Sequence, residues 1–309
     1  MGIKNAIARR LGSIYMPKLE RIEFLVGQNS ILSSRVLRPT YKSLWDSEVS
    51  VYSQWGEDGI LDYLCSAIGL VKPRILELGA GNFIECNSRF LAEFRHASVV
   101  AVDGRNDLEE SVNSLGVSWK THILPIQTWI TPESIAQISK SARDFLDGID
   151  ILSMDIDGND YWVLENFDFS EVSVVVVEYN PLFGYKKAVT VPRNDTFQRT
   201  KEHSSNLYYG ASLPAWVNFF EMSGFNFVGS NSVGSNAFFL KAKYLDCLDF
   251  ELPIELSSHT DWRVRESIDL FGNLTKISNL DRVALIEDLP LFDLQTSQIT
   301  TVGQAVEGY

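Results

Sequence analysis

Three carboxylates lie within six residues in the segment ILSMDIDGNDYW: Asp155, Asp157 and Asp160. They directly follow an apolar run that is typical of a buried strand. A buried carboxylate is costly unless a partner compensates its charge, so these side chains need a role in chemistry or in the fold. Four roles are open at this point: metal ligand, catalytic base, cofactor contact and helix cap.

A glycine turn ends an earlier predicted strand in the segment RILELGAGNF, where Glu77 is followed by Gly79 and Gly81. Glycines at such a point let the backbone turn sharply and let a ligand approach the peptide groups. The dinucleotide pattern G-x-G-x-x-G requires a third glycine, and the chain has Ile84 there, which disfavours NAD. A carboxylate at Glu77 would repel a phosphate but can pair with an amino-acid group.

An acidic residue follows about twenty residues later, where Asp103 ends the predicted strand VVAVDG. A carboxylate at this position can hold both hydroxyls of a ribose. An adenosine sugar beside a cationic amino-acid group, without phosphate, describes S-adenosylmethionine. The alternative is a tight strand-to-helix turn that binds no ligand.

An alternation of predicted strands and helices positions these candidate site residues. Strands are predicted over residues 74–79, 98–104, 117–124, 150–155 and 172–180, with amphipathic segments between them. This alternation predicts a parallel sheet covered by helices on both faces. Ligands of such sheets bind beyond the carboxyl ends of the strands, so Asp155, Asp157, Glu178 and Asn180 are expected to converge on one rim.

Two functions remain for the acidic rim. Asp155, Glu178 and Asn180 offer the oxygen ligands that suit Mg²⁺, and Asp155 or Asp157 can instead act as a direct base. Asp160 has a further explanation, because an acid in the first turn of the following helix interacts favourably with the helix dipole. His203, in the long polar stretch after Asn180, is a second candidate base. An exposed loop histidine without a catalytic role is the alternative for it.

The chain resembles the class I S-adenosylmethionine-dependent methyltransferases, and among them the FkbM-type group of polysaccharide and natural-product loci. The resemblance lies in SQWGEDGIL, ILELGAGN, VVAVDG, LSMDIDGNDYWVLE, VVVVEYNP and YYGASL…GSNAFFL. It implies a Rossmann-like α/β fold with a seven-stranded sheet of order 3-2-1-4-5-7-6 whose last strand is antiparallel. It also implies cofactor contacts from these residues: Gln54, Glu57, Glu77, Gly79, Ala80, Gly81, Asp103, Gly104 and Asp155. Related Mg²⁺-dependent sugar O-methyltransferases carry paired aspartates where this chain has Glu178 and Asn180.

Composition and charge limit the remaining functions. The net charge of −13 argues against a general nucleic-acid binder. Cys65, Cys86 and Cys247 form no CxxC pair, which fits a reducing, cytoplasmic compartment. No apolar run is long enough to span a bilayer. Basic and apolar residues alternate near the N-terminus and predict an amphipathic helix that packs on the domain, forms a homo-oligomer contact or lies on a membrane surface.

Three regions are expected: a helical extension over residues 1–50, a methyltransferase domain over 51–243, and an acidic extension over 244–309 that packs on the domain and ends in a disordered tail. The favoured function is an O-methyltransferase for a sugar, glycan or related hydroxylated metabolite, with S-adenosylmethionine as cofactor and Mg²⁺ as an optional second one. The alternatives are an NAD-dependent oxidoreductase and a non-catalytic scaffold that has kept the fold.

Overall fold

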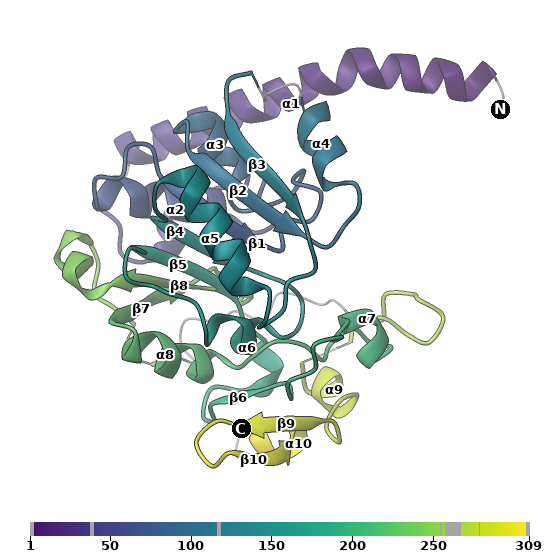
Figure 1. Ribbon diagram of the computed structural model, residues 1–309, viewed down its shortest axis with the longest axis vertical. Coiled ribbons are helices and arrows are strands. Elements are labelled where there is room, and N and C mark those ends of the chain that lie inside the picture. The colour runs from purple at the N-terminus through teal and green to yellow at the C-terminus, as the bar shows by residue number, and fades with distance from the viewer. Residues whose placement is uncertain are drawn as a thin grey trace.

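The computed structural model describes the backbone of residues 3–37, 40–115, 119–253, 255–256, 267–277 and 279–306, and their side chains except at 3–17, 279 and 280. Its main sheet has seven strands in the order β3-β2-β1-β4-β5-β8-β7 (Figure 1). These strands are β1 (Arg74–Leu78), β2 (Ser98–Asp103), β3 (His122–Gln127), β4 (Ile151–Met154), β5 (Val174–Glu178), β7 (Phe225–Ser230) and β8 (Asn236–Lys241).

The predicted topology of this sheet is confirmed. Strands β3, β2, β1, β4 and β5 pair in parallel, and β8 is antiparallel to both β5 and β7. The short strand β6 (Val189–Thr190) belongs to a second sheet, so β7 and β8 are the sixth and seventh strands of the main one. The carboxyl ends of five adjacent parallel strands therefore open on one rim.

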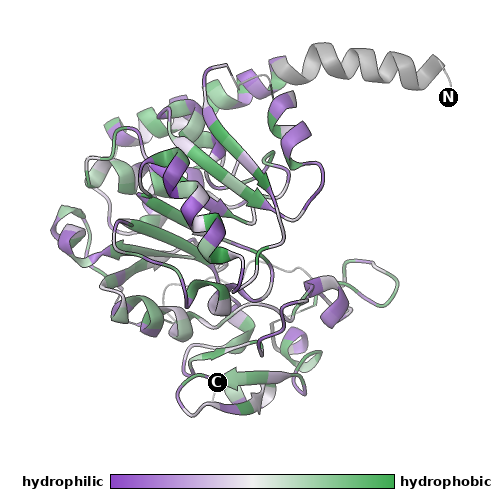
Figure 2. Ribbon diagram, in the orientation of Figure 1, coloured by the Kyte–Doolittle hydropathy of each residue, from purple (hydrophilic) through white to green (hydrophobic). Residues whose placement is uncertain are grey.

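Helices cover both faces of the sheet. On one face, α5 (Ile135–Leu146), α6 (Asp160–Leu164) and α8 (Leu213–Met222) pack against apolar side chains of the strands. On the other face lie the end of α1 (Ile3–Leu37), α2 (Glu57–Ala67), α3 (Arg89–Phe94) and α4 (Leu108–Ser114). The strands between them are hydrophobic along their length (Figure 2). This is the pattern expected of a sheet buried on both sides.

The third strand differs from its predicted position. The sequence predicts residues 117–124, and the structure has β3 at His122–Gln127. Pro125 lies within β3, which among the described strands pairs only with β2 and is an edge strand. An edge strand tolerates proline because one side of its backbone needs no hydrogen bond.

Helix α1 contacts the domain through a single stripe of its C-terminal half. Phe24 lies against Phe90, Ile31 is buried, and Arg35 pairs with Asp62. Leu19, Ile22, Leu25, Val26, Leu32, Val36 and Leu37 are exposed. The membrane or subunit contact predicted for this helix stays a prediction. Among the described residues, no helix is both long and apolar enough to cross a bilayer.

The C-terminal region forms a small sheet with the long segment that follows β5. Strands β9 (Pro290–Asp293) and β10 (Gln298–Thr301) join β6 in the order β10-β9-β6. Helices α9 (Asn279–Ala284) and α10 (Val302–Val306) belong to this region, and its core includes Leu182, Phe183, Val189, Leu291 and Val302. The sequence predicted a disordered tail here, but residues 298–306 are a strand and a helix packed against that core. Residues 307–309 lie outside the described part.

The segment before α2 is held by a buried acid. Asp58 is fully buried, and its Oδ2 accepts hydrogen bonds from the backbone N–H groups of Val51, Tyr52 and Ser53 at 2.8, 2.6 and 2.8 Å. Burial raises the pKa of Asp58 to about 7, although these three hydrogen bonds act in the opposite direction. Trp55, in the same segment, is 38% exposed.

This pKa gives a stability prediction. A carboxyl whose pKa is higher in the folded than in the unfolded protein binds its proton more tightly when folded, so it stabilises at low pH. That contribution is present below about pH 4 and is lost as the pH rises to about 7, by at most about 1.4 kcal/mol per pH unit. Asp58→Asn stays neutral, so its urea-unfolding free energy should fall less than that of the wild type between pH 5 and 8. Parallel pH profiles would contradict the assignment.

Candidate active site

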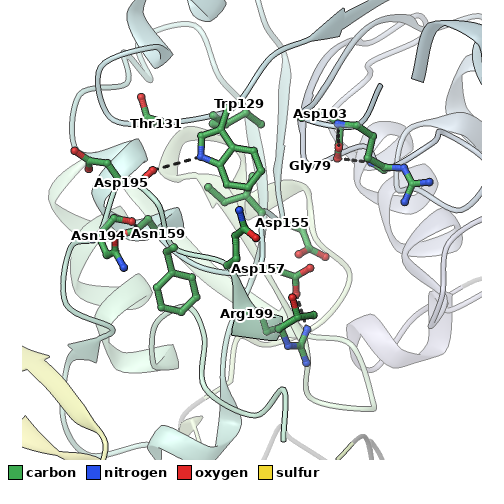
Figure 3. A pocket seen from close by; sticks show the side chains of 18 of the residues that line it. Gly79, Asp103, Trp129, Thr131, Asp155, Asp157, Asn159, Asn194, Asp195 and Arg199 are labelled. Carbon is green, nitrogen blue, oxygen red and sulfur yellow. Dashed lines mark hydrogen bonds and ion pairs between the residues drawn. The ribbon is translucent and has the colours of Figure 1, made fainter. Parts of the chain in front are cut away.

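A cavity of about 590 Å³ opens at the carboxyl ends of β1 to β4. Four turns that follow these strands form its walls, and a segment of the loop after β5 forms the rest (Figure 3). The lining residues are Gly79, Gly81, Asp103, Gly104, Arg105, Trp129, Ile130, Thr131, Pro132, Asp155, Ile156, Asp157, Asn159, Asn194, Asp195, Phe197, Gln198, Arg199, Thr200 and Asn206. Of the predicted cofactor contacts, Gly79, Gly81, Asp103, Gly104 and Asp155 lie in this wall.

The glycine turn brings β1 against the end of β4. Gly79 has φ +87°, and a Cβ placed on it would lie 1.6 Å from the carbonyl oxygen of Asp155. No side chain fits there, so the two strand ends can approach only because residue 79 is glycine. Gly81, with φ +57°, has open space beside it. The turn is therefore fixed by backbone contact at Gly79 and leaves room for a ligand at Gly81.

Asp103 and Trp129 form a second wall. Asp103 accepts hydrogen bonds from the N–H groups of Gly81 and Arg105, both at 2.8 Å. Each carboxylate oxygen has a further lone pair that can accept from a ribose hydroxyl. The indole of Trp129 covers Gly104, where a Cβ would meet it at 2.6 Å. The arrangement offers two acceptor oxygens beside an aromatic ring.

Asp155 and Asp157 lie on the opposite wall, and the carboxylate of Glu178 lies beside them. Asp155, Asp157 and Glu178 each offer an oxygen within 4.8 Å of the others. Asp157 has φ +58°, an uncommon conformation for a residue with a side chain. Asp160 supports it, because its carboxylate accepts from the N–H groups of Ile156 and Gly158, both at 2.9 Å. Asp160 begins α6 as the sequence predicts, and it also shapes the turn that carries Asp157.

Burial and mutual repulsion change the ionisation of this trio. Burial is the largest cause that raises the pKa of Asp155 well above its ordinary value, and the charges of Asp157 and Asp160 raise it further. Burial, followed by the charge of Asp155, raises the pKa of Glu178 in the same way. Two close carboxyls of this kind can share a proton. Asp155 or Glu178 is therefore suited to exchange a proton with a ligand.

Arg199 adds a cation to the trio. Its Nη1 lies 2.5 Å from Oδ1 of Asp157 and 3.9 Å from Oε1 of Glu178. Its Nε donates to the carbonyl oxygen of Asn206 at 2.6 Å, and its guanidinium lies 3.8 Å from the ring centre of Tyr209. Arg199 begins α7 (Arg199–Glu202), within the loop after β5. The loop thus delivers a positive charge to the acidic rim (Figure 3).

The predicted metal ligands do not fit the geometry as a set. Asn180 is fully buried, and its Oδ1 accepts from the N–H of Leu182 at 3.0 Å. Its Nδ2 donates to the carbonyl oxygens of Leu207 and Tyr209. Its amide therefore organises the loop. Asp157 takes its place beside Asp155 and Glu178, and Arg199 already lies among these oxygens.

Five other predicted site residues lie outside the cavity lining. Glu77 shares the strand face of Ile75 and accepts from the N–H groups of Asn87 and Ser88 at 2.7 and 3.2 Å. Ala80 is buried. Gln54 is exposed.

The other two predicted residues have structural contacts. Glu57 is buried and accepts from the side chains of Asn231 and Asn236 at 2.7 and 2.8 Å, which ties α2 to the β7–β8 hairpin. His203 contacts Ser205 Oγ through its Nδ1 at 2.7 Å, and burial lowers its pKa. Neither side chain is placed to act on a ligand in the cavity.

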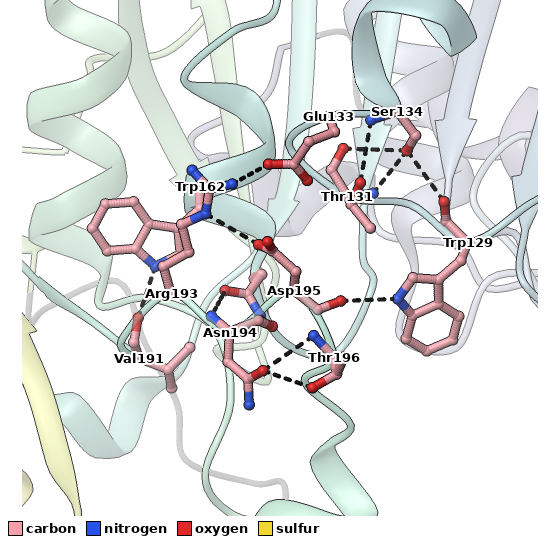
Figure 4. Close-up of polar contacts among 11 residues, drawn as sticks. Trp129, Thr131, Glu133, Ser134, Trp162, Val191, Arg193, Asn194, Asp195 and Thr196 are labelled. Atoms are coloured by element: carbon pink, nitrogen blue, oxygen red, sulfur yellow. Dashed lines mark hydrogen bonds and ion pairs between the residues drawn. The ribbon is translucent and has the colours of Figure 1, made fainter.

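The loop is fastened to the rim by polar contacts, among them those of Trp129 and Arg193 (Figure 4). The amide of Asn159 donates to the carbonyl oxygen of Asn194 at 2.6 Å and accepts from its N–H at 3.0 Å. Arg193 pairs with Glu133, and Trp129 Nε1 donates to the carbonyl oxygen of Asp195 at 3.4 Å. Residues 194–200 are thereby held as one side of the cavity.

Sequence reasoning missed Arg199 and Trp129. A signal existed for Arg199, because a rim with three acids needs a compensating charge and the long polar loop is rich in basic residues. Trp129 follows β3 directly, at the same edge as Asp103. The shifted boundary of the third strand hid that position.

Known proteins give limited additional information. No protein-family model matches the chain, and no curated protein matches it in sequence. Among solved structures, it is similar to a fibrillarin pre-rRNA processing protein of Methanococcus jannaschii, at 11% identity over 56% of this chain and 67% of that one, with a TM-score of 0.37. It is also similar to a fibrillarin of Aeropyrum pernix with natively bound S-adenosyl-L-methionine, at 13% identity over 57% and 74% of the two chains, with a TM-score of 0.34.

A third similar structure is a putative caffeoyl-CoA O-methyltransferase of Staphylococcus aureus, at 11% identity over 75% of this chain and 99% of that one, with a TM-score of 0.39. Similarity at this level assigns no activity to the chain. Any assignment of function therefore depends on the chemistry of the cavity.

Proposed function

We propose that the protein is an S-adenosylmethionine-dependent O-methyltransferase that acts on a hydroxylated acceptor such as a sugar. The observation that carries this proposal is the cavity that the glycine turn and Asp103 share with Asp155 and Asp157. Asp103 would hold the ribose hydroxyls, and the open space at Gly81 would admit the ligand to the backbone. The acidic trio would lie beside the reacting groups.

The charges of the cavity favour this cofactor over a dinucleotide. Asp103, Asp155, Asp157 and Asp195 line it, and Arg199 is already paired with Asp157. A pyrophosphate would have to enter a site with an acidic excess, at a cost in repulsion. A cation such as a sulfonium would lower that excess. The acidic charge of the cavity therefore disfavours an NAD-dependent oxidoreductase, as does Ile84 in place of the third glycine of the dinucleotide pattern.

The reaction requires a base near the acceptor hydroxyl. When bound, S-adenosylmethionine supplies a methyl group that leaves its sulfonium sulfur as the hydroxyl oxygen attacks the methyl carbon. Asp155 accepts the hydroxyl proton, either alone or as one half of the carboxyl pair that it forms with Glu178. The loop excludes water by closing one side of the cavity. Arg199 supplies a cation beside these carboxylates.

The acceptor is proposed from the polar lining. Gln198 and Thr200 come from the loop after β5, and they offer an amide and a hydroxyl group to the cavity. Such groups bind hydroxyls through both donors and acceptors. Phe197 and Trp129 add aromatic surface. This mixture suits a sugar ring, which has polar edges and less polar faces.

Asp103→Asn tests the cofactor part of the proposal. The amide keeps one oxygen for the N–H of Gly81 but loses the charge that strengthens hydrogen bonds to ribose. Such bonds contribute about 1.5–3 kcal/mol, so the affinity for S-adenosylmethionine should fall by roughly 10- to 100-fold. The measurement is the rise in unfolding free energy with ligand, which should reach about 2.7 kcal/mol for the wild type at 100 times Kd.

Asp107→Asn is the matched control, because Asp107 is exposed, pairs with Arg105 and lies outside the cavity lining. It changes the net charge by the same amount. Equal losses of affinity in the two variants would contradict a ribose contact at Asp103.

A further inference from the structure

The loop after β5 places one guanidinium among three carboxylates. A single atom, Nη1 of Arg199, contacts both Asp157 and Glu178. The side chain of Arg199 is only 16% exposed, and that of Glu178 only 13%. A long basic side chain is rarely so buried unless it is paired. Arg199 is buried because it contacts the acidic residues of the rim and residues of its own loop.

We propose that Arg199 is a positioning residue that serves as the built-in cation of this site, in the place that a divalent metal ion would otherwise take between Asp157 and Glu178. The site then needs no metal, although its donor atoms are those that magnesium prefers. Only the catalytic role of Arg199 in this inference rests on the proposed function. The competition between Arg199 and a metal ion concerns the free protein.

The geometry supports a competition for the same oxygens. A bound Mg²⁺ lies about 2.1 Å from its oxygen ligands, so an ion shared by Asp157 and Glu178 would overlap the position of Nη1. Displacing the guanidinium would also break its hydrogen bond to Asn206 and its contact with Tyr209. An ion that stayed beside Arg199 would meet a second positive charge a few ångströms away. Both routes weaken metal binding.

The charge of Arg199 is permanent. Burial lowers its pKa, but the neighbouring Tyr209, Glu178 and Asp157 raise it more, and the result lies above the ordinary arginine value. A metal site gains and loses its ion with the surrounding concentration, whereas this cation arrives with the folded loop. The acidic rim therefore gains this positive charge only when the loop that carries Arg199 is folded against it.

Binding of Mn²⁺, followed by electron paramagnetic resonance without any cofactor, tests the proposal. The wild type should bind Mn²⁺ weakly. Arg199→Met removes the charge and keeps an apolar chain against Tyr209, so its affinity for Mn²⁺ should rise by at least about tenfold, as expected when a unit charge a few ångströms away is removed. Arg199→Lys keeps the charge and should bind Mn²⁺ as weakly as the wild type.

The controls separate charge from structure. Lys201→Met changes an exposed basic residue of the same loop and should leave Mn²⁺ binding unchanged. The gain in Arg199→Met should disappear when Asp157→Asn is added. Equal gains in Arg199→Met and Arg199→Lys, or no gain in Arg199→Met, would overturn the proposal.

Mn²⁺ binding by the wild type tests the proposal even if Arg199→Met does not fold. Tight Mn²⁺ binding by the wild type that Asp157→Asn abolishes would also overturn the proposal. Failure of the protein to bind S-adenosylmethionine would sink the proposed function and leave these outcomes unaffected.

Discussion

Gly79→Ala should destabilise the protein by more than about 3 kcal/mol and abolish binding of S-adenosylmethionine, the largest stability effect we expect from a single methyl group. The added Cβ would lie 1.6 Å from the carbonyl oxygen of Asp155. Overpacking alone costs about 1–3 kcal/mol, and a positive φ at alanine adds about 1 kcal/mol. Because the obstacle is backbone, the ends of β1 and β4 must separate, and this separation displaces the wall that carries Asp155.

Gly81→Ala is the matched control for this substitution. Gly81 also has a positive φ, +57°, but a Cβ there meets no atom within 4 Å. It should cost only the conformational strain of about 1 kcal/mol. Urea unfolding of the two variants separates the effects. Similar losses of stability would mean that glycine is needed for its backbone angle alone, which would contradict the close approach of β1 and β4.

Asp155→Asn should lower methyl transfer by about 10²- to 10⁴-fold, the usual contribution of a positioned base. Affinity for S-adenosylmethionine should change much less, because the ribose contact at Asp103 is untouched. The assay measures transfer of labelled methyl groups from S-adenosylmethionine to an acceptor found among pooled saccharides. Asp168→Asn, an exposed acid that pairs with Arg143, is the control and should keep wild-type activity.

The pH profile adds a second test of Asp155 as the base. Only the ionised carboxylate can accept a proton, and burial, with the charge of Asp157 next, raises the pKa of Asp155 well above its ordinary value. Transfer by the wild type should therefore rise with pH above the ordinary carboxyl range. A flat profile together with full activity of Asp155→Asn would contradict this role.

The strand-end residues could be predicted because they depend on local sequence. Asp103, Asp155, Asp157 and Glu178 each follow or end an apolar run, and parallel strands bring such ends to one rim. Glu77 is different, because side chains alternate along a strand. It points to the face of Ile75, where backbone N–H groups of Asn87 and Ser88 satisfy it.

Contacts made by the long loop could not be predicted in the same way. Arg199 and Asn180 act through partners far along the chain, such as Asp157, Leu207 and Tyr209. The small sheet has the same origin, since the two residues of β6 pair with β9 about a hundred positions later. No periodicity marks such a short strand. Its pairing depends on the apolar core that the loop shares with the C-terminal region.

Calorimetric titration of the wild-type protein with S-adenosylhomocysteine, and in parallel with NAD⁺, tests the central claim most directly. The demethylated product keeps the ribose and the amino-acid group that the cavity is proposed to hold, so it should bind at one site per chain. NAD⁺ should give no heat, because its pyrophosphate meets an acidic rim. Binding of NAD⁺ without binding of S-adenosylhomocysteine would contradict the assignment of this cavity to a methyl donor.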